Sequence, residues 1–495
     1  MHATKTPVWV IALTFAIAAL PLVAGAQQQQ DDMRRILEQR NQAQSNARER
    51  DIMKDEADKS RPTMVVDGRE YRVEHNTNDV GRALYIALRN KQWSEARSLL
   101  DEYLTFSDRD PMLVHYAQGA FARLQGDYAR AQSEYETLLK LKADFIPGQL
   151  ELARVLFEDQ QNAEAKVLFS SIEQSIDRSD AKTSGVLDSI GSFQQALTER
   201  DDWQGTFALG PAWSDNVNRT SASSNCLIFL EGQCYFNRST PDAVKSIGFE
   251  YDAAIEKRWS IRGHHGLYAR MTLFGQSYRD NSQFNEVTAV VQSGYSFKSG
   301  RNAFSLAPSF EYYGLGNQSL YGAPGLHAEW AWTISPTSLM KLEGDWKRLG
   351  YRRQDYGNYL DGETTSVFAT VFRSFGARWM GFAGVDAVDS QAQEDADGFF
   401  QRGIRVGGSL QWPTGIQTTL FASSRWRDYS AYSAVLEARR QDREQGYTLL
   451  FRAQSWSWAG FTPVLTFRRN TVKSNIDWLY SYNRDAVSLK FEHAL

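Results

Sequence analysis

With 495 residues, the chain is too long for one ordinary domain. Its 55 lysines and arginines nearly balance 59 aspartates and glutamates, so the composition implies no polyanionic partner such as nucleic acid. Aromatic residues make up 13% of the sequence, a share that aromatic girdles at two membrane interfaces would explain.

The first 26 residues have the pattern of a secretory signal peptide. Lys5 precedes an apolar run over 8–23, and Ala24-Gly25-Ala26 supplies small residues at a cleavage site. We therefore expect residues 1–26 to be removed and the mature chain to start near Gln27 in an oxidising compartment. An uncleaved anchor is the alternative. No later stretch of 18 apolar residues predicts a membrane helix in the mature protein.

Residues 27–78 have the composition of a leader segment rather than of a folded domain. The segment begins with four glutamines and continues with dense charge, and few large apolar residues occur before residue 63. This composition predicts a flexible charged leader that holds at most a fraying helix. A coiled-coil segment is the alternative, but sustained heptads are absent.

Residues 79–200 show a helical pattern that repeats with a period of about 34 residues, the period of tetratricopeptide repeats. Three positions recur in each repeat. The first holds Trp93, Tyr128 and Asn162, the second holds the small residues Ala96, Ala131 and Ala165, and the third holds the large residues Leu100, Tyr135 and Phe169. The alanines would let paired helices approach, and the large residues would fill the gap between them. About two and a half to three repeats fit 79–176, followed by a capping helix in 183–199. An unrelated array of helical hairpins is the alternative. Stacked pairs form a groove that usually binds protein or peptide.

Residues 203–495 read as short amphipathic strands whose connections alternate between tight turns and long polar loops, as in transmembrane β-barrels. Backbone polar groups need internal partners within a bilayer, so a sheet persists there only as a closed barrel. About seven long and six short connections imply about 14 antiparallel strands. The expected tight turns lie near 263–264, 299–300, 336–337, 376–377, 413–415 and 459–460. The expected long connections are 215–243, 279–283, 315–325, 350–363, 388–400, 428–442 and 472–480.

Alternation of side chains within these strands supports a barrel. In 286–298, apolar residues such as Val291 and Tyr295 occupy one face, and polar residues such as Thr288 and Gln292 occupy the other. A soluble β-sandwich or a β-propeller is the alternative. Strands of roughly 12 residues are long for soluble sheets, and no blade-like repeat is present.

The two cysteines, Cys226 and Cys234, both fall in the first long connection. A pair this close in an exported chain predicts a loop-closing disulfide. No histidine or further cysteine lies near the pair, which argues against a metal site there.

Residues with the spacing of a catalytic, cofactor-binding or metal-binding site are not apparent. The chain has seven histidines, of which His264 and His265 fall at a predicted turn and His327 in a predicted strand. No serine-centred elbow and no phosphate-binding glycine loop occurs. We therefore expect a protein that is not an enzyme, with no catalytic residue, bound metal or cofactor.

The order of signal peptide, helical repeats and barrel resembles the surface lipoprotein assembly modulator (Slam) family, over roughly residues 80–495. Short motifs similar to those of the family are Gly210-Pro211-Ala212-Trp213-Ser214-Asp215-Asn216-Val217-Asn218-Arg219, Tyr356-Gly357-Asn358-Tyr359-Leu360-Asp361-Gly362, Asp397-Gly398-Phe399-Phe400, Gly403-Ile404-Arg405 and Tyr480-Ser481-Tyr482-Asn483-Arg484.

The resemblance implies an α + β membrane protein in which a tetratricopeptide-repeat domain (79–200) stands in the periplasm and a β-barrel (203–495) lies in the outer membrane. It implies a translocon for particular lipoproteins or, in some relatives, for soluble haem-carrier proteins. Implied partners are this cargo, periplasmic chaperones, the barrel-assembly machinery and outer-membrane lipid. The alternatives are a channel for small solutes or exopolysaccharide, and a binding module that acts through its surface loops.

Overall fold

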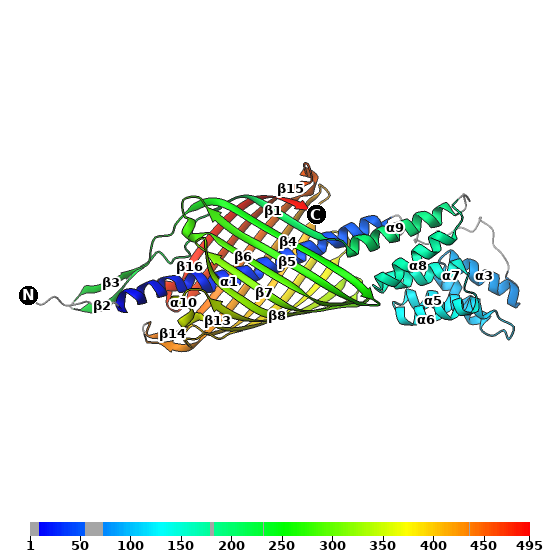
Figure 1. Ribbon diagram of the computed structural model, residues 1–495, viewed down its shortest axis with the longest axis horizontal. Helices are drawn as coiled ribbons and strands as arrows, with labels where there is room; N and C mark the ends of the chain where they lie inside the picture. The colour runs from blue at the N-terminus through cyan, green and yellow to red at the C-terminus, as the bar shows by residue number, and fades with distance from the viewer. Residues whose placement is uncertain (1–8, 55–72, 179–182, 231, 435) are drawn as a thin grey trace, which may run out of the picture.

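The computed structural model describes residues 9–54, 73–178, 183–230, 232–434 and 436–495. The chain folds into a helical region and a closed β-barrel (Figure 1). The helical region contains α3 (Thr77–Arg89), α4 (Trp93–Tyr103), α5 (Pro111–Leu124), α6 (Tyr128–Leu141), α7 (Ile146–Glu158), α8 (Asn162–Ser175) and α9 (Ser184–Asp201). A further helix, α1 (Trp9–Ile52), runs through the barrel toward this region (Figure 1). Within the residues whose side chains are described, no helix is both long and apolar enough to cross a membrane.

The second helix of each pair begins at the first recurring position of the repeat pattern. Helices α4, α6 and α8 start at Trp93, Tyr128 and Asn162. Asp127 caps α6 by accepting a hydrogen bond from the backbone N–H of Arg130, which satisfies one of the free donors of the first turn. The alanines of the repeat are fully buried, and so are two of its large residues: Ala96, Ala131, Ala165, Tyr135 and Phe169. The predicted register is confirmed.

A glycine explains how closely two of these helices approach. Gly119 of α5 faces the ring of Tyr135 on α6, and a Cβ at this position would lie 2.8 Å from the ring. The aromatic side chain therefore fills space that only a glycine leaves open, and this contact joins one helix of a pair to the other.

Fourteen antiparallel strands close into a barrel, which confirms the predicted architecture. They are β1 (Gln204–Ser214), β4 (Ser246–Arg262), β5 (His265–Tyr278), β6 (Glu286–Lys298), β7 (Asn302–Leu315), β8 (Gln318–Ser335), β9 (Ser338–Tyr351), β10 (Gly362–Phe375), β11 (Trp379–Ser390), β12 (Phe399–Gln411), β13 (Ile416–Ser433), β14 (Ala438–Ala453), β15 (Phe461–Ser474) and β16 (Tyr482–Ala494). Each strand pairs with its neighbours in the chain, and β1 closes the ring by pairing with both β4 and β16. Closure leaves no unpaired sheet edge.

The two ends of the barrel differ in their connections. The end nearest the helical region carries the tight turns and is called the short-turn end (Figure 1). The other end, called the long-loop end, carries the hairpin of β2 (Ser224–Leu230) and β3 (Gln233–Ser239) and the short helices α10 (Gln354–Leu360) and α11 (Asp477–Tyr480). Two 3-10 turns, η1 (Ser282–Phe284) and η2 (Gln454–Trp456), complete the connections.

Two predicted long connections are wrong. Strands β7 and β8 are joined by Gly316 and Asn317 alone, both with positive φ as a tight hairpin requires, so most of 315–325 is strand. Most of 428–442 is also strand, in β13 and β14. Polar residues do not end a strand of this barrel, because one face of each strand lies toward the polar lumen. Tyr321 of β8 is an example: it lies within the predicted connection but packs in a buried cluster with Tyr313 of β7.

Side chains of the strands alternate between the outer surface and the lumen, as predicted. On β6, Thr288 and Gln292 are buried on the lumen side, whereas Val291 and Tyr295 are exposed on the outer surface. The barrel thus has an apolar exterior and a polar interior, the reverse of a water-soluble protein.

Residues 27–52 differ from the flexible leader that their composition predicts, because they continue α1 through the lumen (Figure 1). Low apolar content prevents folding in water, but inside a polar lumen the same charged side chains find partners on the barrel wall. The predicted leader also includes residues 55–72, and the predicted signal peptide includes residues 1–8; both segments lie outside the described residues.

Candidate functional site

The helical region carries a groove beside the end of α1. It encloses a cavity of about 950 Å³ between α3, α4, α5, α7 and α9. Each of these five helices contributes an aromatic side chain to its lining: Tyr85, Trp93, Tyr116, Phe157 and Phe193. Large aromatic surfaces combined with fixed charges are typical of surfaces that bind polypeptide.

Four charged residues of this groove form one ion-pair network. Arg123 on α5 lies 2.7 Å from Glu151 and 2.6 Å from Glu158, both on α7. Arg154 holds the second carboxylate oxygen of Glu151 at 2.7 Å. Burial alone would raise the pKa of Glu151, but the two arginines outweigh it and hold the pKa below its ordinary value. The groove therefore keeps its charges fixed in place.

The last turn of α1 belongs to the same groove. Glu49, Arg50 and Met53 line the cavity, and Met53 packs against the core of the helical region. Arg200 on α9 lies 2.7 Å from Glu49 and donates a hydrogen bond of 2.9 Å to the carbonyl of Phe157. One arginine thus joins α1 to two helices of the groove.

The helical region is docked on two turns of the barrel. Asp159, directly after α7, accepts hydrogen bonds from Nε2 of His264 at 2.8 Å and from the backbone N–H of Gly300 at 3.1 Å. Glu164 on α8 accepts a bond of 2.7 Å from the backbone N–H of Gly263. These contacts hold the helical region at the short-turn end of the barrel. Sequence reasoning finds no carboxylate near His264, because Asp159 lies 105 positions away.

Inside the barrel, α1 is held by buried ion pairs with strands all around the ring. The pairs are Asp32 with Arg425 on β13, Arg34 with Asp345 on β9, Arg35 with Glu343 on β9, and Arg40 with Asp252 on β4 and Glu492 on β16. Apolar contact is small by comparison: Met33 and Leu37 meet Ala254 and Phe274. The attachment of α1 to the wall is therefore mainly electrostatic.

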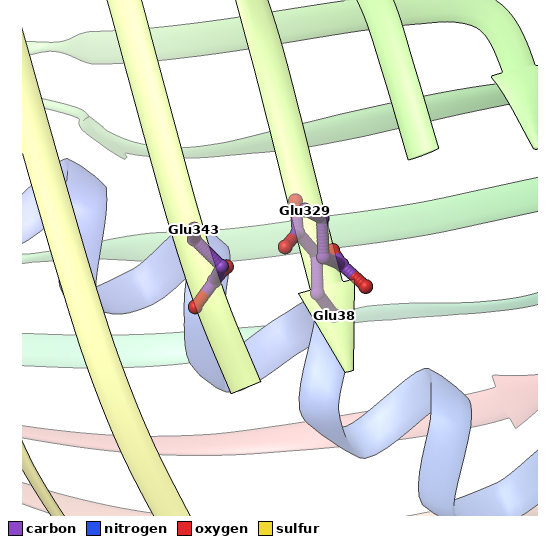
Figure 2. A group of neighbouring side chains, drawn as sticks. All are labelled: Glu38, Glu329 and Glu343. Carbon is purple, nitrogen blue, oxygen red and sulfur yellow. The ribbon is translucent and has the colours of Figure 1, made fainter. Parts of the chain in front are cut away.

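Three carboxylates approach one another where α1 passes β8 and β9 (Figure 2). Glu38 comes from α1, Glu329 from β8 and Glu343 from β9, and one oxygen of each lies within 4.8 Å of the others. Cations already surround them: Lys341 lies 3.1 Å from Glu329 and 3.3 Å from Glu343, and Arg270 lies 3.4 Å from Glu329. These cations account for the close approach of the carboxylates, so we assign the group to the ion-pair network of the lumen.

The structure also places the residues singled out in the sequence. Cys226 and Cys234 are joined by a disulfide between β2 and β3, with 5.7 Å between their Cα atoms. His327 lies on β8, buried in the lumen wall, with Nδ1 2.7 Å from Asp345. His265 lies 2.6 Å from the hydroxyl of Tyr295. None of these histidines joins the groove.

Two family models match the chain. The model of the surface lipoprotein assembly modifier matches residues 203–494, and the model of that family's N-terminal TPR repeats matches residues 66–169. The chain belongs to the surface lipoprotein assembly modifier family. Membership and the closed barrel place the protein in the outer membrane, with the short-turn end and the helical region on the periplasmic side.

Relatives and one solved structure show the range of this similarity. The hemophilin secretion modulator of Acinetobacter baumannii is 40% identical over 87% of this chain and 89% of its own length. Surface lipoprotein assembly modifier 1 of Neisseria meningitidis serogroup B is 25% identical over 84% of this chain and 83% of its own. The outer membrane channel DcaP of Acinetobacter baumannii matches at a TM-score of 0.34 and 11% identity, covering 59% of this chain and 96% of DcaP, and carries no further argument.

Proposed function

We propose that this member of the family is an outer-membrane translocon that exports specific proteins or displays them on the cell surface. The observation that carries the proposal is the position of the groove, which is lined by the end of the same α1 that runs through the lumen, on a helical region docked on the short turns of the barrel. A polypeptide bound there lies at the entrance of a route through the membrane.

The nature of the cargo follows from the relatives. One is named for hemophilin secretion and the other for the assembly of surface lipoproteins. We propose a secreted haem-carrier protein or a surface lipoprotein as cargo, and the 40% identity to the hemophilin secretion modulator favours the first. No catalytic step is needed for such transport.

The helical region would serve as the cargo receptor and the barrel as the route. The proposed division is signal peptide 1–26, leader 27–78, periplasmic repeats 79–200 and barrel 203–495. Further proposed partners are periplasmic chaperones that keep cargo unfolded, the barrel-assembly machinery, and outer-membrane lipid around exposed residues such as Val385 and Ile404.

The first experiment identifies the cargo. Proteins in the supernatant and proteins released by surface proteolysis are quantified in the host with and without the gene. At least one protein should decrease strongly in either fraction and recover when the gene is restored. If no protein changes, and the purified barrel passes small sugars freely, the protein is a solute channel instead.

The second experiment tests the receptor. Deletion of residues 79–200 should leave a heat-modifiable barrel, because barrel hydrogen bonds run between strands, but cargo export should fall at least tenfold. A variant with an exchanged 350–363 loop serves as the control, compared at the same amount of barrel, and should lose less export. Equal export by the deletion variant and the full chain would show that the helical region is not the receptor.

A further inference from the structure

We propose that residues 30–53, the C-terminal part of α1 with the residue that follows it, are a plug that closes the lumen at rest, and that occupation of the groove releases it. The proposal rests on the proposed function, because it names how the same groove would regulate the route. A helical segment of this length rises about 35 Å, more than the apolar band of about 25 Å that an outer-membrane barrel presents.

The helix occupies the middle of the lumen rather than one wall. Its side chains pair with strands β4, β9, β13 and β16, which are spread around the closed ring. A cavity beside it, lined by Gln30, Met33 and Ile36, measures about 100 Å³, which holds a few water molecules but no polypeptide. Because α1 pairs with β9 and with β16, on opposite sides of the ring, passage of a polypeptide requires α1 to move.

The contacts between α1 and the barrel wall can be broken while the barrel stays closed. The ring closes through strand pairing alone, including Thr206 with Ala494 at the seam of β1 and β16. Arg34, Arg35 and Arg40 contribute charge contacts, which water can replace in an open lumen, while Leu37 is the main fully buried apolar residue of the segment.

The groove contacts the plug at the last turn of α1. Glu49, Arg50 and Met53 form part of the cavity wall, so a polypeptide that fills the cavity contacts the end of α1 directly. One part of the link is Arg200, which pairs with Glu49 and also donates to Asn162 at 3.0 Å. Glu49 itself lines the cavity, so a ligand cation that pairs with Glu49 would take it from Arg200 and loosen the end of α1.

Conductance in planar bilayers bathed in potassium chloride tests the plug, because ions need no cargo. The full chain should be closed most of the time. Deletion of residues 30–53 should raise the mean conductance at least tenfold, and Arg34→Gln/Arg35→Gln should open the intact chain several-fold. The control Arg82→Gln/Arg130→Gln neutralises two arginines of the helical surface and should match the full chain. A deletion variant that conducts no better than the full chain would overturn the plug.

Coupling to the groove is tested at the end of α1. Glu49→Gln breaks the pair with Arg200 and should increase the open time of the channel several-fold, although residue 49 lies in the groove and not in the lumen. Asp51→Asn neutralises an exposed acid two positions away and should change nothing. If the lumen variants open and Glu49→Gln stays closed like Asp51→Asn, the plug exists but the groove does not control it.

A locked plug links the inference to export. Gln44 lies 2.7 Å from Glu492, so Gln44→Cys/Glu492→Cys in a Cys226→Ser/Cys234→Ser background can be bridged by a reducible bismaleimide. The bridged protein should export no cargo, and reduction should restore export. Export unaffected by the bridge would overturn the proposal. If the deletion variant conducts but no cargo is found in any fraction, the plug stands and the proposed function fails instead.

Discussion

The helical region and the barrel bury opposite kinds of side chain. The helical region encloses Ala131, Tyr135 and Phe169 in an apolar core, whereas the barrel encloses Asp252, Arg425 and Glu492 and turns its apolar residues outward. The helical region is therefore stabilised by removing apolar surface from water, and the barrel by strand pairing, lipid contact and balanced charge. The same substitution should have different outcomes in the two regions.

The largest expected effect is in the helical core. Phe169→Ala removes a fully buried ring that stacks on Phe193, and it should cost about 3–5 kcal/mol of stability of the helical region. The matched Phe400→Ala removes an outward ring of β12 that is 49% exposed. Limited trypsin digestion should cleave the helical region of the first variant only, and both barrels should keep their heat modifiability. Equal resistance of both variants would remove the contrast between the regions.

The next largest effect is expected from removal of a charge inside the barrel. Asp386 accepts ion pairs of 3.2 Å from both Arg405 and Arg425. Asp386→Ala leaves two buried cations without this partner and should cost roughly 3 kcal/mol, less where water enters the lumen. The neighbouring Val385→Ala, on the outer surface, should stay within about 1 kcal/mol. The temperature at which the barrel loses its compact gel mobility measures both. A larger loss for Val385→Ala would contradict a charge-balanced interior.

The disulfide lies outside both the apolar core of the helical region and the charged lumen of the barrel, so the effect of removing it should stay local. A bridge between Cys226 and Cys234 closes a short loop and contributes roughly 2–3 kcal/mol to the order of that loop. Cys→Ser at both positions should increase protease cleavage within 215–243 and leave the barrel unchanged. Alkylation followed by mass spectrometry of the purified protein checks the bridge itself; free thiols at both positions would refute it.

The contact between the two regions should respond to Asp159→Asn. The change weakens the bonds to His264 and to the backbone N–H of Gly300, by about 1–2 kcal/mol in total. Hydrogen exchange of the peptide that contains Gly300 should accelerate. The exposed Asp144→Asn is the control and should exchange as the unchanged protein does. Unaltered protection in Asp159→Asn would mean that the docking depends on other contacts.

The smallest effect is a pH dependence at the long-loop end. Burial raises the pKa of Asp397 from 3.8 to about 6, with Arg440 opposing the shift and Glu394 adding to it. Because the folded loop holds this proton more tightly than the unfolded one, the contribution is present below pH 3.8 and is lost as the pH rises through about 6. The 391–398 loop should therefore be less protected at pH 7 than at pH 5, after correction for intrinsic exchange rates. Asp397→Asn should remove the difference, and a persistent difference would assign it to another group.

The features that the sequence predicted share one property: their patterns are local. The register of Trp93 and Tyr128, and the alternation around Val291, appear within one turn or one strand. The lumenal course of α1 has no such signal, because Arg34 meets Asp345 across 311 positions and the composition of residues 27–52 resembles that of a disordered segment. Arg200 was missed for the same reason, since its partner Glu49 lies 151 positions earlier.

The seam between β1 and β16 imposes an order on the assembly of this protein. It joins the first and last strands of the barrel, so it forms only after the whole chain has been delivered to the membrane. The repeats depend on contacts between neighbouring helices and can fold much earlier. Because α1 precedes both parts in the chain, it either enters a half-built ring from the side or threads through a finished one. The first route avoids threading, and it would make the helical region, by holding Glu49 through Arg200, a guide that sets α1 in place before the ring closes.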